Sequence, residues 1–170
     1  EFDLNDNISI TNLPKIMNRL GISRKKEAEN SQKLIETVHV KTPSLKQKVK
    51  NLSGGNQQKV VIAKWLNSES SVIIFDEPTR GIDVGSKIEI YKLMNELKLN
   101  DKAVIMVSSE LTECMGISDR MYVMHEGEIT GCVEPHEIKK ITEEDIIKYA
   151  TGSVNEKGDT DNEKTQNQSE

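Results

Sequence analysis

The stretch that decides the fold is SVIIFDEPTRGID, residues 71–83, where a run of apolar side chains ends in two carboxylates and a proline. From Val72 to Phe75 the run is wholly apolar and mostly β-branched, which is typical of a strand buried on both faces of a parallel sheet. The segment AVIMVSSE, residues 103–110, predicts a second buried strand. The residues between the two strands predict a helix, so we expect an α/β fold built on a βαβ unit.

The polar residues that follow these strands lie where parallel sheets bind ligands, at the carboxyl ends of the strands. Asp76, Glu77 and Ser109 are expected there. A charge beside a core is costly unless it is compensated, and Mg²⁺ held by a carboxylate and phosphate oxygens would compensate it. We therefore predict Asp76 as a metal ligand and Glu77 as the group that orients water for attack on a phosphoryl group. The alternative is a strand end whose acids simply face solvent.

A second stretch, NLSGGNQQKVVIAKWL at residues 51–66, predicts a helix that opens with a serine and two glycines. Ser53 suits an N-cap, and Asn56 stands at the third helical position, where a capping box has Glu or Gln. Adjacent glycines cost a helix roughly 1 kcal/mol each relative to alanine, which we interpret as access to bare backbone N–H groups. Such a helix start is an anion site suited to phosphate. The alternative is a plain helix cap after a loop.

The remaining segments are assigned from periodicity and turn signals. The helix at 51–66 is apolar nearly all round, so we expect it to be buried on most sides, with Trp65 in the core. The helix after Asp83 should bury Ile90, Met94 and Leu97. The other assignments are helical structure over 12–39 broken at Gly21, a loop over 40–51, a hairpin over 120–133 turning at Glu126–Gly127, short helices over 135–141 and 142–150, and a disordered tail over 151–170.

Composition excludes several classes of protein. The chain has 170 residues, which suits one core, and a net charge of −5 without a long basic block, so nucleic acid is not an expected partner. No apolar run approaches the length of a bilayer span, so any membrane contact should come through a partner. Cys114 and Cys132 lie far apart without metal-ligand spacing, which predicts two free thiols in a reducing compartment.

Taken together, the two stretches resemble the ATP-binding-cassette (ABC) family in order and spacing. Residues 52–55 match its signature loop, 72–76 its Walker B strand, Glu77 its general-base position and 81–83 its D-loop. The resemblance implies a partial P-loop NTPase fold with part of the helical subdomain. The domain division that it implies is a partial helical subdomain at 1–50, the C-terminal part of the ATPase domain at 51–150, and the tail at 151–170.

Finer features resemble the second ATPase domain of bacterial simple-sugar importers of the ribose and galactose type. They are NQQKV at 56–60, DEPTRGIDVG at 76–85, YKLM at 91–94, SSE at 108–110 and SDRMYVMHEGEI at 118–129. The resemblance implies a subunit that hydrolyses ATP with Mg²⁺ to energise import of sugars such as ribose, galactose or methyl galactoside. The implied partners are the first ATPase domain of the same polypeptide, transmembrane permease subunits and, indirectly, an extracytoplasmic sugar-binding protein. The implied location is peripheral, at the cytoplasmic face of the cell membrane.

Two ATPase domains of this family pair head to tail, so the resemblance implies that one group of residues meets ATP held by the partner domain. These residues are Leu52, Ser53, Gly54, Gly55, Asn56, Gln57 and Asp83. The phosphate loop G-x-x-x-x-G-K-[ST] is absent from these 170 residues, as are a recognisable glutamine loop and adenine-stacking aromatic. We expect them upstream of residue 1 in a longer protein, and we expect the isolated fragment to be inactive.

One position departs from the family pattern. The family usually has a histidine after the second strand, and Ser109 stands there instead. We therefore expect the nucleotide site that contains Glu77 and Ser109 to hydrolyse ATP slowly or not at all. A non-catalytic, regulatory ATP clamp and an importer of another small solute stay open as alternatives. A family member acting in DNA repair or translation is a third, against which the lack of basic clusters argues.

Overall fold

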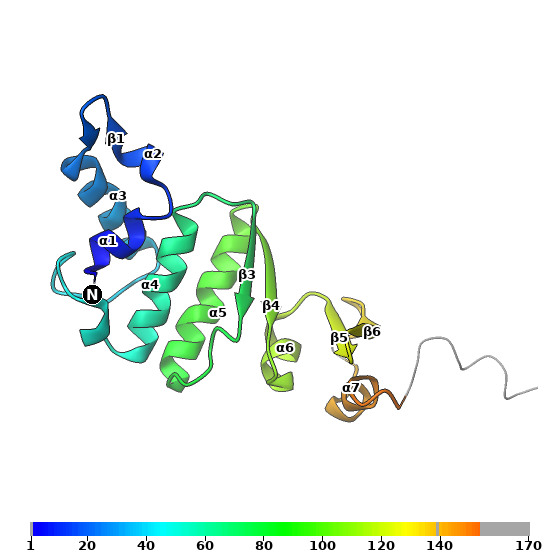
Figure 1. Cartoon of the computed structure of the whole chain (residues 1–170). Helices are drawn as coiled ribbons and strands as arrows, with labels where there is room; N and C mark the ends of the chain where they lie inside the picture. The colour runs from blue at the N-terminus through cyan, green and yellow to red at the C-terminus, as the bar shows by residue number, and fades with distance from the viewer. Residues whose placement is uncertain (1, 139, 154–170) are drawn as a thin grey trace, which may run out of the picture. The chain divides into compact units, whose positions relative to one another are not determined.

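The structure is a computed structural model that describes residues 2–138 and 140–153 (Figure 1). The chain divides into two compact units, residues 1–107 and residues 108–170. The division predicted at residue 50 stays a prediction, as does the tail from residue 154 onward, which lies outside the described residues.

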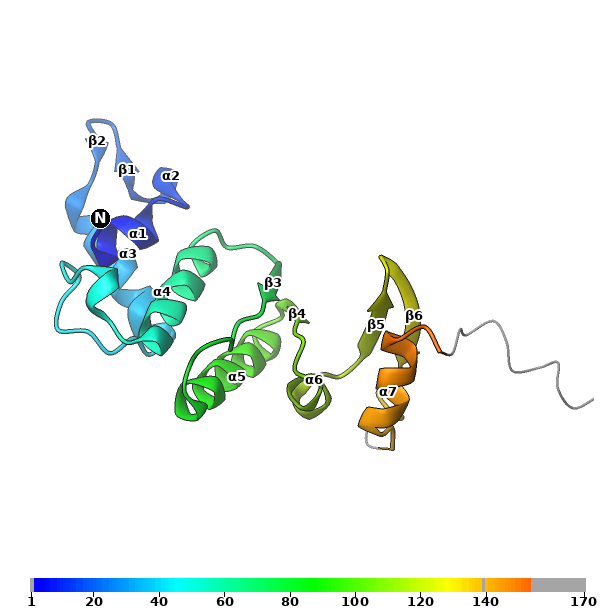
Figure 2. The same cartoon turned by 60° about the horizontal axis from the view of Figure 1, so that its bottom comes forward.

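The first unit contains the predicted βαβ element. Strands β3 (Val72–Asp76) and β4 (Ala103–Val107) pair in parallel, in continuous register from Val72 opposite Ala103 to Asp76 opposite Val107. Helix α5 (Val84–Leu99) connects them, and α4 (Gly54–Leu66) lies beside α5 in both views (Figures 1 and 2). The other elements are α1 (Leu4–Ser9), α2 (Leu13–Ile16), β1 (Met17–Asn18), β2 (Gly21–Ile22), α3 (Arg24–Thr37) and the 3₁₀ turn η1 (Val49–Asn51).

One aliphatic core holds this unit together. As expected, α5 buries Ile90, Met94 and Leu97, and it adds Leu93 to the same stripe. The core draws on α1, α3, α4, β3 and α5, with the buried members Leu4, Ile8, Ile35, Val38, Val40, Val60, Ile62, Ala63, Ile73, Phe75, Ile90, Leu93, Met94 and Leu97. Helices α4 and α5 therefore belong to the same apolar core.

The β3–β4 pair is covered on one face only, and the expectation of strands buried on both faces is wrong for the described residues. Ile73 and Phe75 are buried in the core, whereas Ile74 on the opposite face is 65% exposed. Val72, Ile105 and Val107 are about half exposed, at 49–51%. The helices α4 and α5 supply one layer, and no other element among residues 2–107 covers the second face. An apolar face of this kind is typical of a surface that packs against another segment or chain.

The expected helix over 12–39 is right for α3 and wrong before it. Ser23 caps α3, accepting a hydrogen bond from the backbone N–H of Lys26 at 3.5 Å. Before it, the chain makes one turn of α2 and then the β1–β2 hairpin, where Gly21 has φ = +115° and ends any helical path. Leu20, expected on an apolar helical stripe, is 98% exposed at this hairpin. Gly21 therefore marks a change of structure rather than a break inside one helix.

Helix α3 buries a carboxylate that the apolar pattern did not predict. Glu27 is 2% exposed, and its carboxylate accepts hydrogen bonds from the hydroxyl of Ser9 at 2.9 Å and from the guanidinium of Arg24 at 2.8 Å. Burial acts to raise the pKa of Glu27, but these hydrogen bonds outweigh burial and lower the pKa. The charged form of Glu27 therefore joins α3 to α1.

Helix α4 is not buried all round, so the expectation for Trp65 is wrong. Trp65 is 55% exposed and Val61 47% exposed, and the Lys64 ammonium lies 5.6 Å from the centroid of the Trp65 ring. Lys59 is instead 2% exposed, on the face that packs against α5 and the segment before α4. A run of apolar residues longer than a helix turn cannot place all of its members on one face, and here the partners of α4 select Val60, Ile62 and Ala63.

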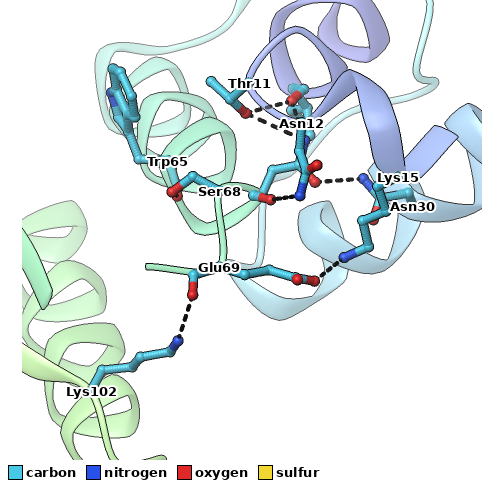
Figure 3. Close-up of polar contacts among 10 residues, drawn as sticks. Thr11, Asn12, Lys15, Asn30, Trp65, Ser68, Glu69 and Lys102 are labelled. Carbon is cyan, nitrogen blue, oxygen red and sulfur yellow. Dashed lines mark hydrogen bonds and ion pairs between the residues drawn. The ribbon is translucent and has the colours of Figure 1, made fainter. Parts of the chain in front are cut away.

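A buried asparagine holds the C-terminal end of α4. Asn67 is fully buried, and its side-chain amide donates to the carbonyl of Ile8 at 2.8 Å and accepts from the side chain of Asn30 at 2.8 Å. The backbone carbonyl of Asn67 accepts from the side chain of Asn12 at 2.8 Å. Figure 3 shows Asn12 and Asn30 converging on this end of the helix, with Lys15 paired to Glu69 beside them. The Asn67 side chain therefore joins α1 and α3 to the end of α4, and its backbone carbonyl binds the N-cap residue of α2.

We expect Asn67→Ala to lower the free energy of unfolding by roughly 2–4 kcal/mol, because it leaves the carbonyl of Ile8 and the amide of Asn30 without this partner. Urea unfolding followed by circular dichroism measures the change. Asn95→Ala, at an exposed position of α5, is the matched control and should change the value by less than about 0.5 kcal/mol. Equal effects of the two substitutions would contradict the role of Asn67.

The second unit contains the predicted hairpin and its supporting helices. Strands β5 (Met121–His125) and β6 (Glu128–Val133) pair antiparallel and turn at Glu126 and Gly127, whose φ values of +49° and +87° suit a two-residue hairpin turn. Helices α6 (Leu111–Ile117) and α7 (Glu143–Ala150) contribute to the apolar cluster under the hairpin. The predicted hairpin and the helix over 142–150 are confirmed. The helix predicted over 135–141 is wrong for the described residues, which form turns.

A capping box fixes the start of α7. Thr142 and Asp145 make a reciprocal capping box at the start of α7, and the hydrogen bond from Thr142 is the main cause that lowers the pKa of Asp145 to about 2.

Cys114 and Cys132 form no disulfide, as expected. Within the described residues no helix is both long enough and apolar enough to span a membrane.

Candidate functional site

The signature loop, residues 52–57, presents the start of α4 to solvent. Ser53 is the N-cap and is exposed, as is Gly54, and the Ser53 side chain does not cap any N–H group of the first turn. The first intrahelical hydrogen bond runs from the N–H of Gln57 to the carbonyl of Ser53 at 2.9 Å. The N–H groups before Gln57 are therefore the helix donors without an intrahelical acceptor, at the positive end of a 13-residue helix.

The two glycines of this loop have different reasons to be glycine. A Cβ atom on Gly55 would lie 2.1 Å from Oγ and 2.6 Å from Cβ of Ser86, so the first turn of α5 occupies the space that a side chain would need. A Cβ atom on Gly54 would make only an ordinary contact of 3.8 Å with Ile82. The prediction that both glycines expose backbone N–H groups is thus incomplete. Gly55 is buried by α5, and Gly54 alone of the two is exposed.

We expect Gly55→Ala to destabilise the protein by about 1–3 kcal/mol through overpacking against Ser86, measured as the free energy of unfolding in urea. Gly54→Ala is the matched control and should be neutral or stabilising by up to about 1 kcal/mol, because alanine favours helix.

The double substitution Gly55→Ala with Ser86→Gly tests the cause. It should recover part of the stability that Gly55→Ala loses, because it removes the side chain that clashes. Additive losses would show that the contact with Ser86 is not the reason for glycine at position 55.

The D-loop, residues 81–83, leads directly into this contact. Gly81 has φ = +73°, a backbone conformation that favours glycine. Asp83 caps α5, since its carboxylate accepts from the N–H of Ser86 at 3.0 Å and from the Ser86 hydroxyl at 2.7 Å. These hydrogen bonds lower the pKa of Asp83, the bond from the Ser86 hydroxyl most of all. Asp83 therefore fixes the side chain that packs on Gly55.

One pocket of ≈ 330 Å³ lies between the starts of α4 and α5. It brings together four of the predicted site residues, namely Ser53, Gly55, Asn56 and Asp83. The other lining residues are Lys41, Lys59, Gly85, Ser86 and Glu89. Leu52 and Gln57 lie outside this lining: Leu52 is half-buried against the core, and the Gln57 side chain donates to the carbonyl of Leu52 at 2.8 Å. These two residues support the loop on the side that faces the core.

An ion pair in the lining of the pocket was not predicted: its lysine, Lys59, is buried, whereas the side chain of Glu89 is 44% exposed. The ammonium of Lys59 pairs with the carboxylate of Glu89 and donates to the carbonyl of His39 at 3.0 Å. The ammonium of Lys41 lies 3.9 Å from the same carboxylate. The hydrogen bond from Lys59 is the main cause that lowers the pKa of Glu89. A lysine within the apolar run of α4 was the one signal in the sequence that could have pointed to this pair.

The two strand-end carboxylates lie as the sequence predicted, at the carboxyl end of β3. Asp76 is exposed, and its side chain forms no hydrogen bond or ion pair within the described part of the chain. Glu77 has φ = +45°, and its N–H donates to the carbonyl of Val107 at 2.9 Å. Asp76 is thus suited to supply one ligand to Mg²⁺, which commonly takes one or two carboxylates together with water and phosphate oxygens. Residues 2–138 and 140–153 contain no group of three or more metal-ligating side chains.

Ser109 is exposed and follows β4 by two residues in the sequence. It belongs to the second unit, so its position is described only within that unit. Its predicted role beside Glu77 stays a prediction.

Comparison with known proteins shows similarity to ABC transporter proteins. The family model described as "ABC transporter" matches residues 2–80. A ribose import ATP-binding protein, RbsA, of Halalkalibacterium halodurans is 51% identical over 152 residues, which is 89% of this chain and 30% of that protein. A putative ribose/galactose/methyl galactoside import ATP-binding protein of Agrobacterium fabrum is 47% identical over 147 residues, covering 86% of this chain and 28% of that protein. The chain is thus similar to ABC transporter ATPases over most of its length.

The fold agrees with that of solved ABC cassettes. An ATP-binding cassette of an ABC transporter superposes with a TM-score of 0.74 at 23% identity, covering 88% of this chain and 62% of the cassette. A dimeric post-hydrolysis state of another cassette, bound to ADP and Pi, gives a TM-score of 0.66 at 22% identity, covering 79% of this chain and 57% of that one. The chain thus has a partial P-loop NTPase fold of the ABC type, and it spans about 30% of the length of the curated relatives named above.

Proposed function

We propose that this chain is the C-terminal part of the second ATPase domain of a subunit that energises import of simple sugars such as ribose or galactose. The observation that carries the proposal is the exposed start of α4, where Ser53 and Gly54 present a hydroxyl and unpaired backbone N–H groups on a rigid helix. The sugar class is supported by the ribose import relative that is 51% identical. The subunit would work at the cytoplasmic face of the membrane, bound to a permease that receives sugar from an outside binding protein.

In the proposed mechanism, the signature loop binds the γ-phosphate of ATP held by the first ATPase domain. The hydroxyl of Ser53 and the N–H groups of the first turn of α4 are fixed in place before the nucleotide arrives. Donors that need no reorganisation stabilise the charge that develops during phosphoryl transfer. Because the two halves of the site lie on different domains, closure of the pair depends on ATP, and that closure would drive the permease.

The strand-end carboxylates would serve the other nucleotide site of the pair. Asp76 would hold Mg²⁺, which neutralises phosphate charge when it is bound. Glu77 would orient the attacking water, held at the strand end by its hydrogen bond to Val107. Asp83 would keep the D-loop in the shape that places Gly55 beside Ser86.

We expect Ser53→Arg in the full-length subunit to abolish sugar transport, because the larger cation fills the space before the start of α4. ATP binding to the first domain should stay largely intact. Sugar uptake into proteoliposomes measures the first effect, and fluorescent-nucleotide titration measures the second. Ser71→Arg, at an exposed position before β3, is the matched control and should transport normally. Transport by the Ser53→Arg protein would refute the assignment of the loop.

A second candidate function, a regulatory ATP clamp, is favoured by Ser109 in place of the usual histidine. A serine lacks the ring nitrogen that the family places near the γ-phosphate and water. If the clamp is right, Glu77→Gln in the full-length subunit should retain at least about half of the ATPase rate at saturating ATP, because Glu77 is then not a working base. The loss of a working general base would instead cost about 10²-fold or more. A loss of that size would show that Glu77 is a working base and would exclude the clamp.

A further inference from the structure

The side-chain amide of Asn56 is held at both ends. Its Oδ1 accepts a hydrogen bond from the backbone N–H of Lys41 at 2.8 Å, and its Nδ2 donates to Oγ of Ser53 at 2.9 Å. A backbone N–H can only donate, so Lys41 determines which end of the amide is oxygen. The amide nitrogen of Asn56 must then face Ser53, and the Ser53 oxygen must act as the acceptor.

This arrangement leaves the hydroxyl hydrogen of Ser53 free to donate elsewhere. A serine hydroxyl has one hydrogen to donate and an oxygen that accepts. The oxygen is engaged by Asn56, and no other hydrogen bond of the Ser53 side chain occurs among the described residues. Because the Asn56 hydrogens approach the oxygen, the hydroxyl hydrogen is directed away from the amide. Ser53 is thus prepared as a donor before any anion arrives.

The segment that carries the Lys41 N–H is itself anchored. Lys59, which is 2% exposed, donates to the carbonyl of His39, and His39 has φ = +54°, so the chain turns sharply there. Lys59 is fixed in turn by Glu89 of α5. A continuous series of contacts therefore runs from a buried cation, through the backbone of residues 39–41 and the amide of Asn56, to the exposed hydroxyl of Ser53.

We infer that Asn56 is a positioning residue that makes Ser53 a hydrogen-bond donor to the phosphate of the bound nucleotide. The inference rests on the proposed function of the signature loop. Asn56 acts through Ser53, and it touches neither the nucleotide nor the reacting atoms in this role. An aspartate at the same position has the same shape but accepts only, so it would draw the Ser53 hydrogen inward and remove the donor.

The test is a double-mutant cycle in the full-length subunit assembled with its permease. The variants are Ser53→Ala, Asn56→Asp and the double substitution, and the readouts are kcat and KM for ATP hydrolysis. Ser53→Ala and Asn56→Asp should each lower kcat at least about tenfold, since the loss of one preorganised donor to a developing anion costs roughly 10²–10³-fold. Asn51→Asp, an exposed position that gains the same charge just before the loop, should leave kcat within about twofold of wild type.

The double substitution decides the inference. If Asn56 acts through Ser53, the double variant should lie within about twofold of Ser53→Ala, because the hydroxyl that Asn56 orients is already absent. If Asn56→Asp lowers kcat by the same factor in both backgrounds, its effect comes from charge or lost stability, and the inference is wrong. A loss with Ser53→Ala but none with Asn56→Asp overturns the inference alone. Full activity of Ser53→Ala overturns the proposed function of the loop as well.

Asn56→Ala keeps the test decisive if the aspartate variant does not fold. Alanine removes both hydrogen bonds without adding charge and leaves the Ser53 hydroxyl free to rotate. It should lower kcat about two- to fivefold in the wild-type background and have no effect on Ser53→Ala. Equal losses in both backgrounds would again contradict the inference.

Discussion

The close approach of α4 and α5 at Gly55 and Ser86 is the constraint on which the candidate site depends. No side chain fits at position 55, since Ser86 fills that space, and Ser86 is held there by the carboxylate of Asp83. The start of one helix is thereby seated on the start of the next, and both helix dipoles end at one pocket. Below this contact, the pair Lys59–Glu89 joins the same two helices where their apolar core ends.

Because of this constraint, one side of the signature loop is packed against the protein and the other side is exposed to solvent. Leu52 packs against the core, Gln57 bonds to its carbonyl, and Asn56 is bonded to the segment before the helix. The far end of α4 is fixed by Asn67, so the helix cannot rotate or slide freely. Ser53 and Gly54 alone face solvent within the first turn. Rigidity of this kind lowers the cost of ordering donors around an anion.

The sequence was informative where the pattern is local. The βαβ unit, the N-cap Ser53 and the Glu126–Gly127 turn were all predicted from residues close together in the chain. The candidate site residues were found by motif, although their partners were not. Ser86 and Lys41 meet the loop from outside α4, and Lys59 of α4 pairs with Glu89 of α5. Periodicity carries no information about such contacts between elements. Trp65 and the strand residues were misassigned for the same reason, because exposure depends on which elements cover a face.

The uncovered face of the β3–β4 pair has a consequence for any isolated copy of this chain. Val72, Ile74, Ile105 and Val107 form apolar ladders on two short parallel strands whose outer edges carry unpaired backbone groups among the described residues. Such strands recruit identical strands from other molecules, edge to edge and then face to face. Where nothing covers this face, the two strands form a nucleus for aggregation. The aggregated fraction then grows with protein concentration and with time.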